Sequence, residues 1–163
     1  MRYLLDSNTF IEAKNGYYDF EVCPGFWDWL LAKHAEGYLF SIEKIGKELT
    51  DGTDELADWV VTSASGLFLA PDAATIAKMK NVAEWVMRQP YGEKSRANFF
   101  AKADPFLVAH AAAHGHTVIT HEKKVGDDCK QVKIPNVCEA FGVNWMHSFT
   151  LLRKEKARFV LAI

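Results

Sequence analysis

The sequence predicts an α/β layer fold with a short, mainly parallel central sheet. Short apolar runs alternate along the chain with segments that show the apolar period of helices, and this alternation is typical of parallel sheets. A length of 163 residues fits one domain with a sizeable core, and we find no internal repeat, low-complexity tract or linker. The 49% hydrophobic and 25% charged residues are close to globular averages, so disorder is not expected over most of the length.

The first half of the chain is expected to hold three strands separated by helices. The strands are expected at Tyr3–Leu5, 38–41 and 66–71. Helices are expected from near residue 9 to 15, at 26–37, at 42–52 and at 54–64. Ser7 or Asn8 can cap the first of these helices, because both side chains accept hydrogen bonds from free backbone N–H groups.

The second half begins with the longest helix and ends with a short one. Helices are expected at 72–89, with Asp72 as its cap, at 95–115, at 134–143 and at 148–159. A boundary at Asp104-Pro105 divides the second of these and places Asp104 at an N-cap, and Ser148 caps the last. Strands are expected at 116–120 and 143–146. We assign residues 1–147 to the domain and 148–163 to a C-terminal helix and tail packed on it.

Four carboxylates fall where sites form in such folds. Asp6 ends the first strand, Glu48 lies in the helix after the second, Asp104 begins the helix that leads into the strand at 116–120, and Glu122 lies just past that strand. Ligands bind outside the carboxyl ends of parallel strands, so all four could reach one rim. Clustered carboxylates repel unless a cation compensates, and oxygen ligands suit Mg²⁺ or Mn²⁺.

Three segments carry a resemblance to a known family. "LLDSNTFI", "SIEKIGKEL" and "KADPFLVAHAAAHGHTVITHE" resemble, in order and spacing, the three motifs of PIN domains, and "IPNVCEAFGVNWM" is similar to a PIN ending. The resemblance extends from about Arg2 to about Trp145 and is nearest to VapC-like toxin ribonucleases, in an outlying branch. It implies a three-layer α/β/α sandwich.

The resemblance also implies roles for individual residues. Asp6 and Asp104 would bind Mg²⁺ or Mn²⁺, and Glu48 would bind it or position a water. Glu122 stands where the family usually has Asp, so it would act around the metal ligands or on a second ion. The residues expected to orient the carboxylates are Ser7, Asn8 and Thr120. The residues expected to contact substrate phosphate are His121, Lys123 and Lys124.

By the same resemblance, the protein would be an endoribonuclease and the toxin of a type II toxin–antitoxin pair. It would cleave single-stranded or loop RNA by metal-activated water, leaving a 5′-phosphate. Its partners would be RNA, a small antitoxin protein and a second copy in a homodimer. The segment "FWDWLL" is a candidate for the dimer contact or the antitoxin groove.

Other functions stay open at this point. An aspartyl-nucleophile phosphatase would want a second acid two residues after Asp6, where Asn8 stands. A catalytically degenerate PIN-fold module that binds protein or RNA is a further alternative, because Glu122 replaces the usual Asp. Zinc is disfavoured: His110 and His114 share a helix face, but the chain lacks the ligand spacing of structural zinc sites.

Composition bears on the cellular setting. A net charge of −2 argues against a nucleic-acid coat protein, which would be strongly basic. The three cysteines form no CxxC pair and no even framework, so we expect a reducing compartment. The sequence has too short an apolar start for a signal peptide and no run long enough for a membrane span. We therefore expect a cytoplasmic protein.

Overall fold

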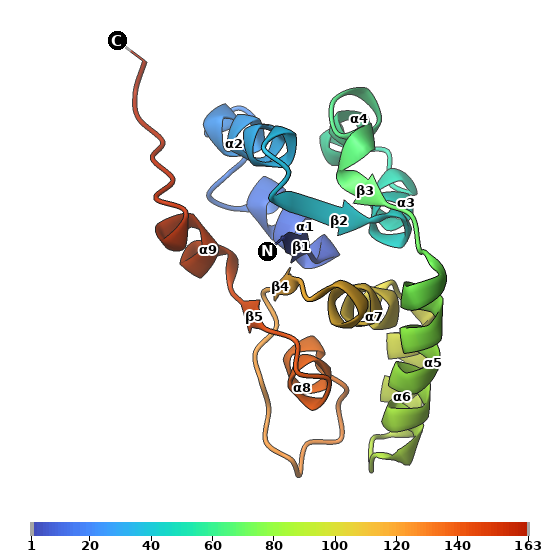
Figure 1. The fold of residues 1–163 in the computed structure, drawn as a ribbon. Helices are drawn as coiled ribbons and strands as arrows, with labels where there is room; N and C mark the ends of the chain where they lie inside the picture. Colours follow the sequence, from blue (N-terminus) through green and yellow to red (C-terminus); the bar gives the residue numbers. More distant parts are fainter. Residues whose placement is uncertain (1, 163) are drawn as a thin grey trace.

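A five-stranded parallel sheet in the order β3-β2-β1-β4-β5 forms the centre of the computed structural model, which describes residues 2–162 (Figure 1). The strands are β1 Tyr3–Leu5, β2 Leu39–Ile42, β3 Phe68–Leu69, β4 Thr117–Ile119 and β5 Trp145–Met146. Each neighbouring pair is parallel. The predicted parallel sheet is therefore confirmed, with β1 at its centre.

The central strands read as unbroken apolar runs because both of their faces are covered. All three residues of β1 and all three of β4 are buried. These strands pair in register from Tyr3 opposite Thr117 to Leu5 opposite Ile119. The residues that follow each strand, Asp6 and Thr120, are thereby brought side by side at the carboxyl edge of the sheet.

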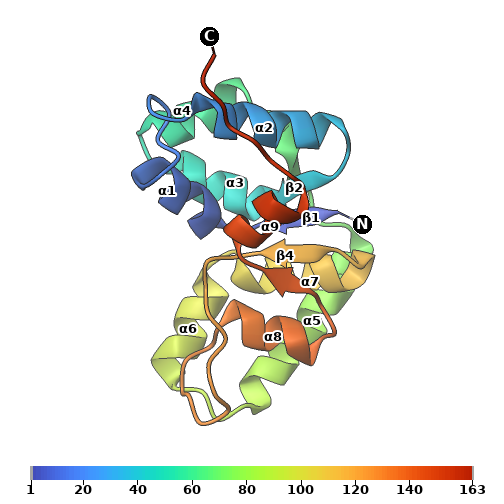
Figure 2. The same ribbon diagram turned by 90° about the vertical axis from the view of Figure 1, so that its left-hand side faces the viewer.

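Helices cover both faces of the sheet, as Figure 2 shows with the strands between the two layers. The first layer holds α1 Ser7–Asn15, α2 Pro24–Ala35, α3 Glu43–Thr50 and α4 Glu55–Thr62. The second layer holds α5 Ala73–Arg88, α6 Glu93–Ala101, α7 Asp104–His114 and α8 Ile134–Ala140. The chain steps from β1 to β3 in one direction and then returns past β1 to β4, so right-handed connections place the two sets on opposite faces. In the part of the chain described, no helix combines the length and the apolar character that a membrane crossing needs.

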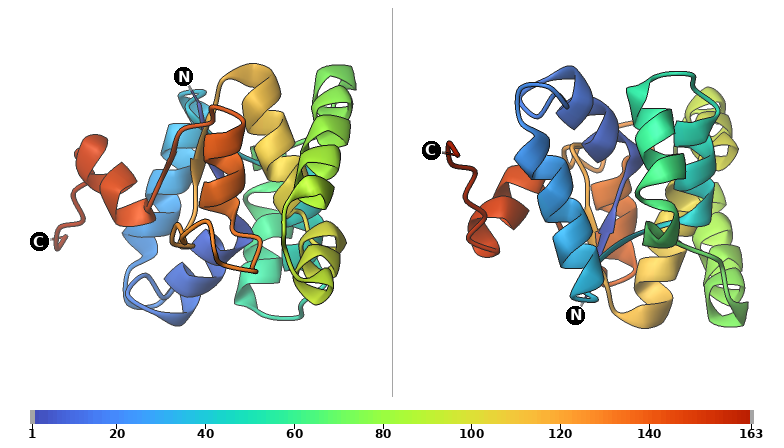
Figure 3. Two further views of the ribbon diagram at one scale, coloured as in Figure 1. Left: turned by 90° about the horizontal axis from the view of Figure 1, so that it is seen from below. Right: turned by 90° about the horizontal axis from the view of Figure 1, so that it is seen from above.

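The C-terminal helix α9, Ser148–Lys154, lies beside α2 in both views of Figure 3. Leu151 and Leu152 are buried in the main core, and the Tyr3 hydroxyl donates a hydrogen bond of 2.7 Å to Glu155 Oε1. Beyond the helix, the ring of Phe159 packs against the ring of Phe26 on α2, with centroids 6.2 Å apart. These contacts attach the end of the chain to the layer formed by α1 and α2.

The start of α1 differs from the prediction. The helix begins at Ser7 rather than near residue 9, and Asp6 occupies the N-cap position without a side-chain capping bond. Neither Ser7 nor Asn8 caps the helix, because both lie inside it. The Asp6 carboxylate is engaged by the hydroxyls of Thr120, across the sheet, and of Ser7, so it does not act as a side-chain cap of the helix.

Two further helix starts are shifted by one residue from the prediction. Asp104 is the first residue of α7 and Ala103 is its N-cap, so Asp104 is not the cap. Ser148 is the first residue of α9, and the cap is His147, whose Nδ1 accepts a hydrogen bond from the N–H of Phe149 at 3.3 Å. The Ser148 hydroxyl instead forms a hydrogen bond with the His121 side chain.

The segment "FWDWLL" is mainly core. Phe26, Trp27 and Leu30 are 2%, 2% and 1% exposed, because they form the side of α2 that packs on the sheet. Trp27 and Leu30 offer no surface for a contact with another chain, so the prediction for these two is wrong, whereas Phe26 lines an open pocket. Trp29 and Leu31 are only partly buried. The homodimer itself stays a prediction.

Candidate active site

Asp6 lies at the carboxyl end of β1 and is 1% exposed. Its Oδ2 accepts a hydrogen bond of 2.9 Å from the Thr120 hydroxyl, and its Oδ1 accepts a longer one of 3.4 Å from Ser7. Its backbone N–H donates to the carbonyl of Ile119 at 2.9 Å, which continues the β1–β4 ladder by one residue. The pairing of two parallel strands therefore sets the position of this carboxylate, and the two hydroxyls orient it.

Asp104 lies in the first turn of α7, which belongs to the second helical layer. The start of that helix is held by Glu48 on α3, whose Oε1 accepts a hydrogen bond of 2.7 Å from the N–H of Ala103. Glu122 has a similar attachment, because its Oε2 accepts a hydrogen bond of 2.7 Å from the N–H of Ile134 at the start of α8. Each glutamate thus uses one carboxylate oxygen to satisfy a helix N-terminus beside the site.

The four carboxylates influence one another's charge. Burial raises the pKa of Asp6 to about 6; the Thr120 hydrogen bond opposes this rise and the charge of Glu122 adds to it. Burial also raises the pKa of Asp104 to about 7, and the charges of Asp6, Glu122 and Glu48 contribute to the rise. A protein gains no stability from such a cluster, so its perturbed acids point to a functional site.

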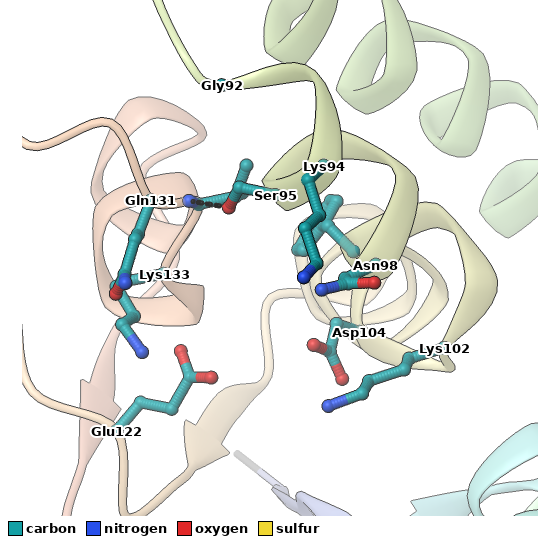
Figure 4. A pocket seen from close by; sticks show the side chains of 11 residues that line it. Gly92, Lys94, Ser95, Asn98, Lys102, Asp104, Glu122, Gln131 and Lys133 are labelled. Carbon is teal, nitrogen blue, oxygen red and sulfur yellow. Dashed lines mark hydrogen bonds between the residues drawn. The ribbon is translucent and has the colours of Figure 1, made fainter.

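An open pocket of about 560 Å³ contains Asp104 and Glu122. Figure 4 shows these two carboxylates on opposite walls, with Lys102 beside Asp104 and Lys133 beside Glu122. The other lining residues are Gly92, Lys94, Ser95, Asn98, Phe99, Gln131 and Val132. The pocket therefore combines two carboxylates with lysine and amide side chains at its rim. This combination suits the binding of a phosphodiester together with a cation.

Several of these rim residues could not be identified from the sequence. Lys94 and Asn98 are four residues apart on α6 and so share one face of it, which is a weak signal for a common surface. Lys133 and Gln131 lie in an irregular loop with no periodic pattern. Ser95 fixes that loop, because its hydroxyl accepts a hydrogen bond of 2.9 Å from the N–H of Val132.

Four other predicted site residues, Asn8, His121, Lys123 and Lys124, do not line the pocket that contains Asp104 and Glu122. The Lys124 ammonium forms an ion pair of 2.6 Å with the Glu139 carboxylate, and both residues line another pocket. Lys123 is exposed, and neither lysine lines the pocket of Asp104. Both ring nitrogens of His121 are engaged, Nδ1 with Glu12 and Nε2 with Ser148, so it has no free nitrogen for a phosphate. Asn8, partly buried in the first turn of α1, makes no side-chain hydrogen bond within residues 2–162.

The donor chemistry suits a hard divalent cation. Within residues 2–162, no three His, Cys, Asp or Glu side chains are placed so that they could hold a metal ion as a group. Mg²⁺, however, usually takes only one or two protein carboxylates and keeps several waters. Asp6 and Asp104 are the candidates for such a pair, because the charge of Asp6 raises the pKa of Asp104; Asp104 lines the open pocket, whereas Asp6 and Glu48 are not among its lining residues. These two residues fit Mg²⁺ or Mn²⁺, and Glu48 and Glu122 would act around them.

Comparisons with known proteins agree with this architecture. The family model described as "Domain of unknown function (DUF4411)" matches residues 3–159. No curated protein matches the sequence. The structure is similar to a chain in "Crystal Structure of FitAcB from Neisseria gonorrhoeae", with a TM-score of 0.56 and 17% identity, over 90% of this chain and 98% of that chain. At this identity the likeness shows the fold, which is a PIN-like α/β/α sandwich.

Proposed function

The chain belongs to the family described as a domain of unknown function (DUF4411), and we propose that it is a Mg²⁺- or Mn²⁺-dependent endoribonuclease of the VapC-like kind. The observation that carries the proposal is the placement of Asp6, which is buried, and Asp104, which lines an open pocket, at the carboxyl edge of a PIN-like sheet, where the charge of Asp6 raises the pKa of Asp104. Burying two acids together has a cost in stability that only a ligand or a reaction explains.

Each nearby residue has a defined task in this proposal. Asp6 and Asp104 hold the cation; when bound, it offsets charge on the phosphate and lowers the pKa of a water. Thr120 fixes the direction of the Asp6 carboxylate through its 2.9 Å hydrogen bond. Glu48 fixes the start of α7 and with it the position of Asp104.

The rim of the pocket selects the substrate. Lys94, Lys102 and Lys133 bind non-bridging phosphate oxygens on either side of the cleaved bond. The carboxylates are recessed, Asp6 completely, so the backbone must enter the pocket, and a single strand or a loop can bend to do so. We therefore propose single-stranded or loop RNA as the substrate, cleaved to leave a 5′-phosphate.

Regulation is proposed to come from a small antitoxin protein. Asp104 and Glu122 present carboxylates inside an open pocket. A partner segment with a cationic side chain would complement that charge and exclude RNA at the same time. The protein would thus be the toxin of a type II pair, and a homodimer is proposed as its assembly.

A catalytically degenerate binding module is the second candidate. The observation in its favour is that Glu48 and Glu122 each already accept a hydrogen bond from a backbone N–H. If these two residues serve only to hold helix starts, the pocket could bind RNA or protein without cleaving it. Metal binding separates the two candidates, because the module has no need of a cation.

The test is cleavage of a labelled mixed RNA pool with Mg²⁺, with Mn²⁺ and with EDTA. Asp6→Asn and Asp104→Asn are run beside the wild type, and Asp28→Asn, an exposed acid on α2, is the matched control. We expect metal-dependent products with 5′-phosphates from the wild type and the control only. A folded wild type that neither cleaves RNA nor binds Mn²⁺ would refute the nuclease and favour the binding module.

A further inference from the structure

A second pocket, of about 440 Å³, is lined by the residue that precedes Glu122 in the chain. His121 lines the second pocket and Glu122 lines the first, and consecutive Cα atoms are only about 3.8 Å apart. The other lining residues come from α1 and the turn after it, from α2 and from the start of α9: Thr9, Glu12, Ala13, Asn15, Gly16, Tyr17, Tyr18, Phe26, His147, Ser148 and Phe149. Residues 121 and 122 are thus the point where the two sets of lining residues come nearest along the chain.

Aromatic rings form one wall of the second pocket. Tyr17 is 81% exposed, and its ring has an edge contact with Phe149, with centroids 6.4 Å apart. The Phe149 ring is stacked on His147, with centroids 5.3 Å apart and planes 25° apart. Tyr17 does not serve core packing, because most of its side chain is exposed to solvent.

Polar groups line the same pocket beside these rings, since the centroid of the His121 ring lies 4.1 Å from that of His147. His121 accepts or donates a hydrogen bond of 2.7 Å with the Ser148 hydroxyl, and its other nitrogen pairs with Glu12. This network fastens α1 to α9 and fixes the floor of the pocket. The Glu12 side chain is still 56% exposed, so it can meet a ligand from solution. Asn15 adds an amide near the same end of α1.

We propose that this pocket binds the base of a nucleotide that flanks the scissile phosphate, and thereby contributes to the sequence preference of the enzyme. The inference rests on the proposed ribonuclease function. An unstacked RNA base is recognised by stacking on an aromatic ring and by hydrogen bonds to its edge. Tyr17 offers the stacking face, and Glu12 can accept a hydrogen bond from an exocyclic amine.

The chemistry favours bases with an amino group on the edge that faces Glu12. Cytosine and adenine carry such a donor, as guanine does at N2, whereas uracil has no amino group and presents carbonyl oxygens that a carboxylate would repel. The presence of Glu12 beside Tyr17 in the lining of this pocket therefore predicts a preference for C or A over U. A protein side chain could also occupy an aromatic pocket, but only a nucleotide strand links it to the phosphate site next to it.

The test measures RNA binding without cleavage. The double variant Asp6→Asn, Asp104→Asn is titrated with short fluorescein-labelled homopolymers of A, C, G or U, followed by anisotropy, with and without Mg²⁺. Tyr17→Ser is added to this background, and Tyr38→Ser, a half-exposed tyrosine at the opposite edge of the sheet, is the matched control. Glu12→Gln is added separately, because it keeps the shape of the side chain and removes the charge.

We expect Tyr17→Ser to weaken binding by roughly 5- to 150-fold, the range found for loss of one stacked base, and Tyr38→Ser to leave it unchanged. Glu12→Gln should reduce the difference between C or A and U. RNA binding that is equal in the two tyrosine variants would overturn the base pocket while the nuclease stands, and would leave the pocket to a protein partner. Tyr17-dependent binding by a protein whose wild type never cleaves RNA would support the pocket and refute the nuclease.

Discussion

Replacing Asp104 with asparagine should stabilise the metal-free protein at neutral and alkaline pH while it abolishes metal-dependent cleavage. In the folded chain the pKa of Asp104 is raised from 3.8 to about 7, first by burial and then by the charge of Asp6. The unfolded chain loses this proton near pH 4, so between about pH 4 and 7 the folded state binds more protons and its stability falls as the pH rises. Asparagine has no charge to lose, so the variant escapes this fall.

The size of the effect follows from the same pKa. A rise from 3.8 to about 7 corresponds to a ceiling of about 4 kcal/mol once the carboxylate is fully ionised. Water in the open pocket screens Asp104, and part of the repulsion is shared with Asp6 and Glu122. We therefore expect a gain of about 1 to 2 kcal/mol at pH 8, or about 3 to 6 °C in melting temperature for a chain of this size.

The assay is thermal unfolding in EDTA at pH 5 and pH 8, with Asp28→Asn as the exposed control. The stability of Asp104→Asn relative to the wild type should rise between the two pH values, and the control should show no such change. Addition of Mn²⁺ at pH 8 should raise the melting temperature of the wild type and leave that of Asp104→Asn unchanged, since a ligand that binds only the folded state stabilises it. A variant that is no more stable than the wild type at pH 8 would refute the coupled acidic centre.

Three further predictions concern other parts of the molecule. Gly46→Ala should cost about 1 to 3 kcal/mol in urea unfolding, because a Cβ on this buried helix would lie 2.9 Å from the ring of Phe68; an unchanged midpoint would show that the ring can move aside. Burial and neighbouring imidazoles lower the pKa of His116 to about 4, so the unfolded chain binds more protons below about pH 6.5 and stability is lost as the pH falls toward 4. His116→Leu should therefore lose less melting temperature than the wild type between pH 7 and 5, and an equal loss would contradict the assignment. Lys102→Ala with Lys133→Ala should raise KM several-fold and flatten its dependence on KCl, whereas a salt dependence equal to that of the wild type would exclude phosphate contacts there.

The sheet and the position of Asp6 could be predicted because both follow from local pattern. A buried strand such as Tyr3–Leu5 appears as a continuous apolar run, and the residue after it must lie at the carboxyl edge. Parallel pairing with the strand at Thr117–Ile119 then brings Thr120 to Asp6 without any further information. Here the sequence-based expectation and the structure rest on the same physical rule.

Helix starts could not be predicted to the residue, because capping side chains found partners elsewhere. Ser148 is a good N-cap by residue type, but its hydroxyl bonds to His121 from a distant segment. Asp104 is likewise a good cap by residue type, but Ala103 takes the cap position, and the N–H of Ala103 donates to Glu48 of α3. Such exchanges depend on tertiary contacts that no local pattern encodes.

The loop after β4 shows the same limit for the substrate contacts. Lys124 follows Glu122 by two residues, yet it lies away from the acidic pocket and pairs with Glu139. The cause is a clamp between the loop and α8, where the N–H and carbonyl of Val125 bond to the amide of Asn136 at 3.0 and 2.8 Å. Nearness in sequence to an active-site acid therefore says little about a lysine in an irregular loop, and Lys133 takes the position instead.

Two hydrogen bonds connect the elements that carry Asp6 and Asp104, and the repulsion between these two carboxylates explains why such connections are needed. Asp6 and Asp104 repel each other, so the fold must hold them against that force. Thr120 ties β4 to β1 at Asp6, and Glu48 ties the first helical layer to the second at Asp104. Loss of the second tie should therefore let Asp104 move away from Asp6 and lower its pKa. Glu48→Ala is thus expected to weaken Mn²⁺ binding, even if Glu48 never contacts the ion.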